Sequence, residues 1–206
     1  MLRIITRSDD AGSSRSANAA ILKAAQGAFV KNISLMAPGN YIDEAARLLK
    51  GQKHICFGMH FTMNAEWDKV KWGPVCQKLK GTAMTDAMSG WIKEKGLVDH
   101  RYFYNVLPQI DEISSTDGLF GKVLEKMADG QYFYLTHPAM PLEDMYLTGN
   151  KSKPTERIVE GRKKDMDFVV SPTTVQICEK YNAVPIRYDE AVYSEGDRDS
   201  IKCWFG

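Results

Sequence analysis

The beginning of the chain alternates between short apolar runs and helix-like stretches, and this alternation restricts the fold more than any other feature. Three runs read as strands: LRIIT at 2–6, NISLMAP at 32–38 and HICFGMHFTM at 54–63. Between them lie two stretches with helical character, SANAAILKAAQGA at 16–28 after a serine cap and YIDEAARLLK at 41–50. Strand, helix, strand, helix, strand is the pattern of a parallel sheet, so we predict an α/β fold.

The later part of the chain contains further elements of the same kind. We expect a helix at 118–128, a strand at 131–139, a polar loop at 148–157, a Pro-initiated helix at 171–182 and a last strand at 183–192.

The segment 64–116 has poor periodicity and contains Trp67, Trp72 and Trp91. We interpret it as an irregular, loop-rich insertion within a single domain that spans residues 1–206. A long loop of this kind often forms a lid or one wall of a substrate site.

Composition restricts the partners and the location. Apolar residues make up 44% of the chain, charged residues 26%, and the net charge is +1. This balance gives no electrostatic reason to expect a nucleic acid or a membrane surface as a partner. No apolar run approaches the ~18 residues of a membrane span, and no signal peptide is visible. With four scattered cysteines and no CxxC, we expect a cytoplasmic protein.

Polar residues follow three of the predicted strands. Asp9 and Asp10 come after the first, His60 lies in the third, and His137 lies near the end of the strand at 131–139. Because the carboxyl ends of neighbouring parallel strands share one edge, these groups are expected to meet there. Two carboxylates with one or two imidazoles suit zinc, or a harder divalent ion whose waters complete the shell. Such an ion supports hydrolysis.

Each of these residues has another possible role when it is taken alone. Asp9 and Asp10 could cap the helix that follows them. His60 could be a core histidine with backbone partners, and His137 could be an ordinary loop residue. The coincidence of three positions at one predicted edge favours the metal-site hypothesis.

Several segments resemble the YdjC-like, or ChbG/HpnK-fold, carbohydrate deacetylases. They are IITRSDDAG, VKNISLMAPG, EAARLL, FGMHFTMNAEW, YLTHPAM and GRKKDMDFVVSPTTVQICEKYNAVPIRYDEAV, which lie within residues 1–75 and 131–192. The resemblance implies a distorted and here shortened (β/α) barrel of mostly parallel strands. It also implies the removal of N-acetyl groups from sugars such as chitooligosaccharides with the help of a divalent metal.

Matched motif by motif, the resemblance implies roles for four residues. Asp10 and His60 would be metal ligands, and Asp9 would be the general base on metal-bound water. His137 would be the acid, or the polarising group, near the leaving amine.

One family feature is missing. Members carry a segment that reads Asp, then Gly or Ser, then His between the third strand and the His-Pro strand, and its His is the third protein ligand. The only histidine between His60 and His137 is His100, in a different context. Two protein ligands with waters suit Mg²⁺ and make a poor zinc site, so we expect Mg²⁺, with Zn²⁺ or Mn²⁺ as alternatives. His137 or His100 could substitute, or catalysis could have been lost.

Trp67, Trp72 and Arg162 are the candidate substrate-binding residues. The tryptophan rings could stack on a pyranose, although packing of the loop is the simpler explanation. Arg162 and Asp165 form an Arg-x-x-acid pattern. The resembling proteins share this pattern. Arg162 could orient an active-site carboxylate, or the two residues could form an exposed i,i+3 helix pair.

These observations predict a metal-dependent hydrolase that removes an N-acetyl group from an acetylated sugar. One alternative is a non-catalytic sugar-binding or regulatory protein on a decayed deacetylase scaffold, which the missing ligand supports. Another is a metal-dependent hydrolase that acts on a different bond, because a fold does not fix the substrate. A shortened barrel would expose a sheet edge, so we expect a homo-oligomer or a covering loop.

Overall fold

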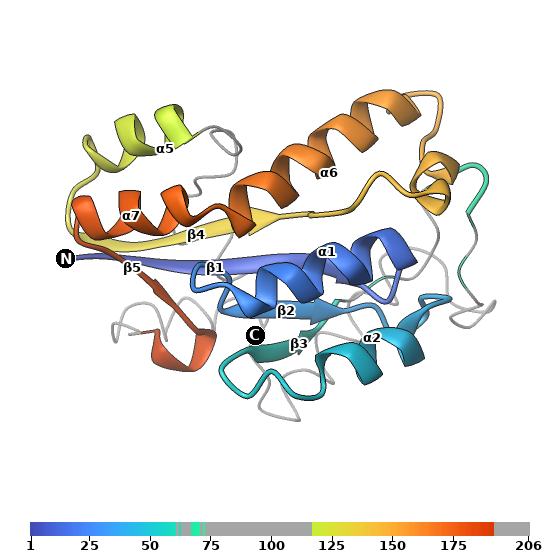
Figure 1. The fold of residues 1–206 in the computed structure, drawn as a ribbon, viewed down its shortest axis with the longest axis horizontal. Helices are drawn as coiled ribbons and strands as arrows, with labels where there is room; N and C mark the ends of the chain where they lie inside the picture. The colour runs from blue at the N-terminus through green and yellow to red at the C-terminus, as the bar shows by residue number, and fades with distance from the viewer. Residues whose placement is uncertain (61, 63–66, 71, 73–116, 192–206) are drawn as a thin grey trace, which may run out of the picture.

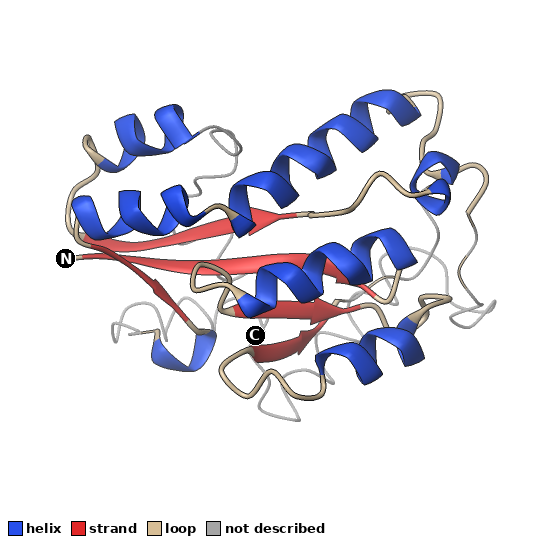
Figure 2. Ribbon diagram, in the orientation of Figure 1, coloured by secondary structure: helices blue, strands red, loops and turns tan. Residues whose placement is uncertain are grey.

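The structure, a computed structural model, describes residues 1–60, 62, 67–70, 72 and 117–191. Most of the predicted insertion at 64–116, with His100 in it, lies outside the described residues. The rest is an α/β fold built on a sheet of parallel strands, as the sequence predicts (Figures 1 and 2). Along the described strands this sheet is open and is not closed into a barrel.

In the described part of the chain the sheet has five strands, in the order β3-β2-β1-β4, and β5 also pairs with β1. Their bounds are Leu2–Ala11 for β1, Asn32–Leu35 for β2, Cys56–Met59 for β3, Gly130–Thr136 for β4 and Ala183–Ile186 for β5. Because β1 is buried along almost its whole length, the sheet is organised around the first strand of the chain.

One edge of β1 changes partner along its length. The other edge pairs with β4 from Leu2 to Ser8. The edge of β1 whose partner changes pairs first with β5, over Leu2 to Ile5, and then with β2, from Arg7 onward. The fully buried Asn32 fills this junction: its side-chain amide donates to the carbonyl oxygens of Thr6 (2.8 Å) and Ile186 (3.0 Å). The end of β5 is therefore tied to the start of β2.

Among the described residues, five α-helices and two 3-10 helices surround the sheet. They are α1 (Arg15–Gln26), α2 (Ile42–Leu49), α5 (Asp117–Leu124), α6 (Thr155–Val170), α7 (Pro172–Lys180), η2 (Glu143–Leu147) and η3 (Tyr188–Glu190). Among the described helices, none has the length and apolar character needed to cross a bilayer.

The main core lies between the sheet and the helices α1, α5, α6 and α7. Its centre is an aromatic cluster of Phe29, Phe120, Tyr134 and Phe168, whose ring centroids lie 5.1–5.8 Å apart, mostly edge to face. Such pairs add to the free energy gained by burying the rings. On the opposite face of the sheet a smaller cluster contains Ile5, Phe133 and Ile186.

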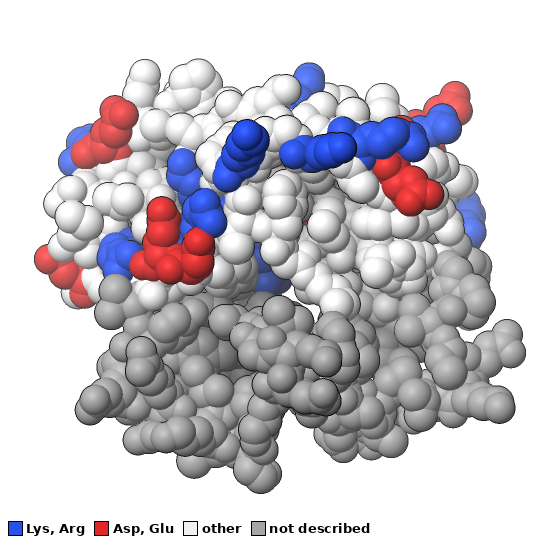
Figure 3. All heavy atoms as spheres, turned by 90° about the horizontal axis from the view of Figure 1, so that it is seen from below, with Lys and Arg blue, Asp and Glu red and all other residues white. Residues whose placement is uncertain are grey.

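Charged side chains of both signs lie on the surface. On the face seen in Figure 3, Lys and Arg side chains lie next to Asp and Glu side chains at both sides of the molecule. This mixture agrees with the net charge of +1.

Several predicted element boundaries are wrong, and two of them change how the chain is divided near its end. The polar loop expected at 148–157 ends earlier, because α6 begins at Thr155 and continues to Val170. Only a narrow stripe of α6 is buried, and the rest of its surface is highly charged, so its helical apolar period is weak. The strand expected at 183–192 ends at Ile186, where the chain turns into η3.

The loops that follow β1 and β2 approach each other closely at two glycines. Gly12 has φ +98°, a left-handed conformation that favours glycine, and its carbonyl accepts a hydrogen bond from the Tyr41 amide (2.9 Å). A Cβ on Gly39 would lie 2.6 Å from the carbonyl carbon of Gly12 and closer still to its oxygen. The close contact of these two loops therefore requires glycine at position 39.

Gly39→Ala should lower the free energy of unfolding by about 1–3 kcal/mol, because the new methyl group overlaps backbone that cannot move away. Gly161→Ala is the matched control: position 161 lies inside α6 with open space around it. That change should raise stability by about 0.5–1 kcal/mol through the better helix propensity of alanine. Urea unfolding measures the free energy of unfolding of both variants. Equal changes in that free energy for Gly39→Ala and Gly161→Ala would contradict the close-contact explanation.

Candidate functional site

Three of the predicted site residues meet at the carboxyl edge of the sheet. Asp9 and Asp10 lie at the end of β1, and His60 follows β3 directly. The Nε2 atom of His60 is 3.3 Å from Oδ1 of Asp10 and 3.7 Å from Oδ2 of Asp9. The same parallel edge therefore brings together residues that are about fifty positions apart in sequence.

An irregularity in β1 allows both carboxylates to face the same histidine. In a regular strand, adjacent side chains point to opposite faces of the sheet. The pairing of β1 with β2 shifts register between Ser8 and Ala11, and Asp10 has φ +73°. Aspartate tolerates this left-handed conformation better than most residues. The Asp10 carbonyl then accepts a hydrogen bond from the Ser13 amide (3.0 Å), which turns the chain into α1.

Asp10 is a buried carboxylate with a strong cationic partner. Oδ2 of Asp10 is 2.7 Å from an Nη atom of Arg162, a residue of α6. Burial alone would raise the pKa of Asp10, but the positive charge of Arg162, with His137 and His60 nearby, lowers that pKa well below its ordinary value of 3.8. Asp10 is therefore ionised, and its Oδ1 atom remains directed at His60.

Asp9 is buried more deeply and has its own set of partners. The Arg7 guanidinium forms an ion pair with both carboxylate oxygens, and the Ser34 hydroxyl donates to Oδ1 (2.5 Å). Burial would lower the pKa of Arg7, but the neighbouring Asp9 and Tyr188 raise it, so Arg7 stays charged. The two carboxylates are thus balanced by two different arginines.

Helix α6 also contacts the His137 segment. The backbone N–H of His137 donates to Oδ2 of Asp165 (2.8 Å), one helical turn after Arg162. Arg162 is 9% exposed, so the Arg-x-x-acid pattern faces the site and is not an exposed surface pair. His137 itself is half-buried and lies near enough to Asp10 to influence its pKa.

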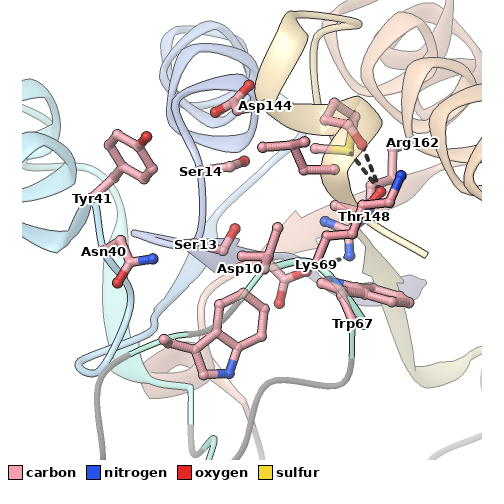
Figure 4. Close-up of a pocket in the computed structure, with 14 residues that line it drawn as sticks. Asp10, Ser13, Ser14, Asn40, Tyr41, Trp67, Lys69, Asp144, Thr148 and Arg162 are labelled. Carbon is pink, nitrogen blue, oxygen red and sulfur yellow. Dashed lines mark hydrogen bonds and ion pairs between the residues drawn. The ribbon is translucent and has the colours of Figure 1, made fainter. Parts of the chain in front are cut away.

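A pocket of about 340 Å³ opens beside Asp10 (Figure 4). Loops at the carboxyl edge of the sheet supply most of its wall. It is lined by Asp10, Ser13, Ser14, Asn40, Tyr41, Trp67, Lys69, Val70, Trp72, Asp144, Met145, Leu147, Thr148 and Arg162. The lining therefore combines aromatic rings with hydroxyl, amide and charged groups.

The structure places both predicted tryptophans at this pocket. Trp67 is only 5% exposed, and the charged groups of Arg162 and Lys153 lie 6.0 Å and 5.9 Å from its ring centroid. Contact with Arg162 gives Trp67 a role in packing the arginine that pairs with Asp10. Whether either tryptophan also contacts a substrate remains a prediction.

Sequence reasoning missed several residues of the pocket wall. Asn40 and Tyr41 follow β2, so the rule that places functional groups after parallel strands could have identified them. Asp144 had no such signal. It lies in η2, and its carboxylate accepts from the Arg15 and Ser16 amides at the start of α1 (2.6 and 3.2 Å), which fixes η2 against α1.

The donor set can be tested against a metal ion. Asp10 Oδ1 and His60 Nε2 lie close enough to bind one ion together, and carboxylate oxygen with imidazole nitrogen is a common ligand pair. In the described part of the chain, no group of three or more His, Cys, Asp or Glu residues is placed to hold a metal. The pair therefore fits a divalent ion that keeps several waters, and it lacks the three protein ligands of catalytic zinc.

Comparisons with known proteins give a family and a fold. The sequence model of the family described as YdjC-like protein matches residues 3–116. A solved structure from Enterococcus faecalis V583, of a proposed cellobiose-phosphate cleavage protein, superposes with a TM-score of 0.64 at 10% identity. The match covers 91% of this chain and 98% of that chain, and at this identity it shows a shared fold. No curated protein matches the sequence.

The depressed pKa of Asp10 predicts how stability depends on pH. A carboxyl whose pKa is lower in the folded state stabilises the fold above its ordinary value of 3.8 and loses that effect as the pH falls further. Asp10→Asn should therefore destabilise the protein by on the order of 2 kcal/mol near neutral pH, and by less in acid. Urea unfolding over a pH series measures this.

Asp129→Asn is the control, because that carboxylate is highly exposed and lies at the opposite end of the molecule, next to the N-terminus. A stability difference between wild type and Asp10→Asn that stays constant or grows in acid would contradict the ion pair with Arg162.

Proposed function

The chain belongs to the YdjC-like protein family, and we propose that it hydrolyses the N-acetyl group of an acetylated sugar. The observation that carries the proposal is the cluster of Asp9, Asp10 and His60, with His137 close to Asp10, and Asp10 joins this cluster to the pocket because it lies in the pocket wall. Adjacent acids and histidines are the groups that amide hydrolysis needs for proton transfer.

The pocket supports a sugar as the substrate. Its volume of about 340 Å³ fits a small ligand. Trp67 and Trp72 can cover the apolar face of a pyranose, while Ser13, Asn40 and Tyr41 offer hydrogen bonds to its hydroxyl groups. The proposed substrate of the Enterococcus protein, cellobiose phosphate, is also a carbohydrate.

A divalent ion, Mg²⁺ in this proposal, would be held by Asp10 and His60. When bound, such an ion polarises the amide carbonyl and makes water more acidic. Arg162 occupies Oδ2 of Asp10 and so orients Oδ1 toward His60. Ion binding and arginine pairing therefore use different oxygens of one carboxylate.

Two residues move protons in the proposed reaction. Asp9, which Arg7 contacts at both oxygens, accepts the proton of the attacking water as the new C–O bond forms at the acetyl carbon. His137 donates a proton to the sugar nitrogen as the C–N bond breaks, so that acetate and an amine leave. The Asp165 contact to the His137 amide fixes the backbone at this position.

A second candidate is a sugar-binding protein without catalysis. The observation that favours it is that the described residues offer two metal ligands and no third. The same pocket would bind the sugar, while bound metal and hydrolysis would be absent. A hydrolase that cleaves another acyl bond is a third candidate, since the proton-transfer groups would serve an ester equally well.

Acetate release from N-acetylglucosamine oligosaccharides tests the proposal directly. We expect release by the wild type with added Mg²⁺ or Mn²⁺. The turnover number should fall by about 10²–10⁴-fold in His137→Ala, because an acid–base group is lost. His54→Ala is the matched control: His54 lies near the amino end of β3 and contacts the Ala25 carbonyl.

The outcomes separate the three candidates. Release of acid from simple esters, with none from acetylated sugars, would indicate the other hydrolase. Saturable sugar binding without release of any acid would favour the non-catalytic protein. A His137→Ala rate equal to that of wild type would remove His137 from the mechanism.

A further inference from the structure

We propose that Tyr188, near the far end of the described chain, is a positioning residue for Asp9 and acts on it through Arg7. The inference rests on the proposed function, in which Asp9 accepts a proton. Tyr188 does not line the pocket, so any effect on the reaction must pass through its neighbours.

Arg7 is the cationic partner of Asp9 and orients its carboxylate. One Nη atom of Arg7 donates to Oδ2 of Asp9 (2.6 Å), and Nε lies 2.5 Å from Oδ1. Both side chains are about 95% buried, so water cannot replace this partner. Arg7 thus contacts both oxygens of Asp9, but only the contact to Oδ2 is a hydrogen bond, because the buried Nε atom has no hydrogen-bond partner among the described residues. The two contacts together restrict the orientation of the carboxylate.

Arg7 is in turn held on its other side. Its second terminal nitrogen donates to the Tyr188 hydroxyl (2.8 Å), and the guanidinium carbon lies 5.1 Å from the centroid of the Phe133 ring. The rings of Phe133 and Tyr188 are 6.4 Å apart and tilted by 32°. The hydroxyl of Tyr188 therefore accepts from the only guanidinium nitrogen that Asp9 does not engage.

The position of Tyr188 is fixed by the sheet itself. Its backbone N–H donates to the side-chain oxygen of Asn32 (2.8 Å). The Asn32 amide also holds Thr6, the residue before Arg7, and the end of β5 at Ile186. The chain from Asn32 to Tyr188, Arg7 and Asp9 is thus continuous, and most of it is buried.

This arrangement also gives each of the two adjacent carboxylates a cationic partner of its own. Arg162 balances Asp10 from α6, and Arg7 balances Asp9 from within β1. If Arg7 moved away, Asp9 would turn toward the other cation or toward His60. A loosened Arg7 should therefore impair proton transfer more than substrate binding.

Tyr188→Phe tests the inference with a minimal change, because it removes only the hydroxyl. We expect kcat to fall about tenfold with KM unchanged, the size of effect seen when a supporting hydrogen bond is lost. Tyr132→Phe is the matched control, since its hydroxyl also makes one hydrogen bond, to the Ala128 carbonyl (3.0 Å), but at the amino end of β4. A change in KM alone, or equal effects of both variants on kcat, would overturn the inference.

A second measurement does not depend on activity. Urea unfolding of Tyr188→Phe, Asp9→Asn and the double variant gives the coupling between two side chains that share Arg7 as a partner. Each substitution changes the equilibrium constant of unfolding by some factor. The factor measured for the double variant should differ from the product of the two single-variant factors by at least about twofold. The pair of Tyr132→Phe with Asp9→Asn should give the simple product.

If Asp9→Asn does not fold, Ser34→Ala takes its place in the cycle, because Ser34 also donates to Asp9. Coupling without acetate release by the wild type would contradict the proposed function and leave the link from Tyr188 to Asp9 supported. Independent effects on stability would refute that link, whether or not the protein is an enzyme.

Discussion

Two adjacent buried carboxylates, Asp9 and Asp10, impose the constraint on which the rest of the structure depends. They are 3% and 8% exposed, and a buried charge without a partner costs several kcal/mol. Two arginines meet this requirement from different parts of the chain. Arg7 comes from the same strand, and Arg162 comes from a helix that the chain reaches only after β4 is complete. The ion pair between Asp10 and Arg162 therefore joins the first strand to the second half of the molecule.

Further contacts hold the two arginines and the neighbouring segments in place. The Trp67 ring covers the Arg162 side chain, and Asp165, one turn later on α6, binds the His137 backbone. On the other side, Tyr188 and the Phe133 ring enclose Arg7. A divalent ion at Asp10 and His60 would enter a site that already contains two cations. Its affinity should be moderate, which agrees with a ligand pair that leaves most positions to water.

Much of this could be predicted from the sequence. The apolar runs identify the first three strands, and the rule for parallel sheets brings Asp9 and Asp10 to the same edge as His60. The register shift and the positive φ of Asp10 could not be predicted, because they depend on pairing with β2. Helix α6 was not predicted as an element, since few of its residues are buried. The Arg-x-x-acid pattern indicated that Arg162 could orient an active-site carboxylate, but the choice of Asp10 is a long-range contact that the pattern alone does not give.

Titration of the purified, chelator-treated protein with Mn²⁺, followed by electron paramagnetic resonance, tests the central claim most directly. The account predicts one bound Mn²⁺ that exchanges readily and keeps most of its waters. This binding should disappear in both Asp10→Asn and His60→Ala and persist in Asp129→Asn. Binding that survives both substitutions would place the ion elsewhere. A tightly bound Zn²⁺ that remains after dialysis against chelator would show that a third side chain completes the site, contrary to a centre with two protein ligands.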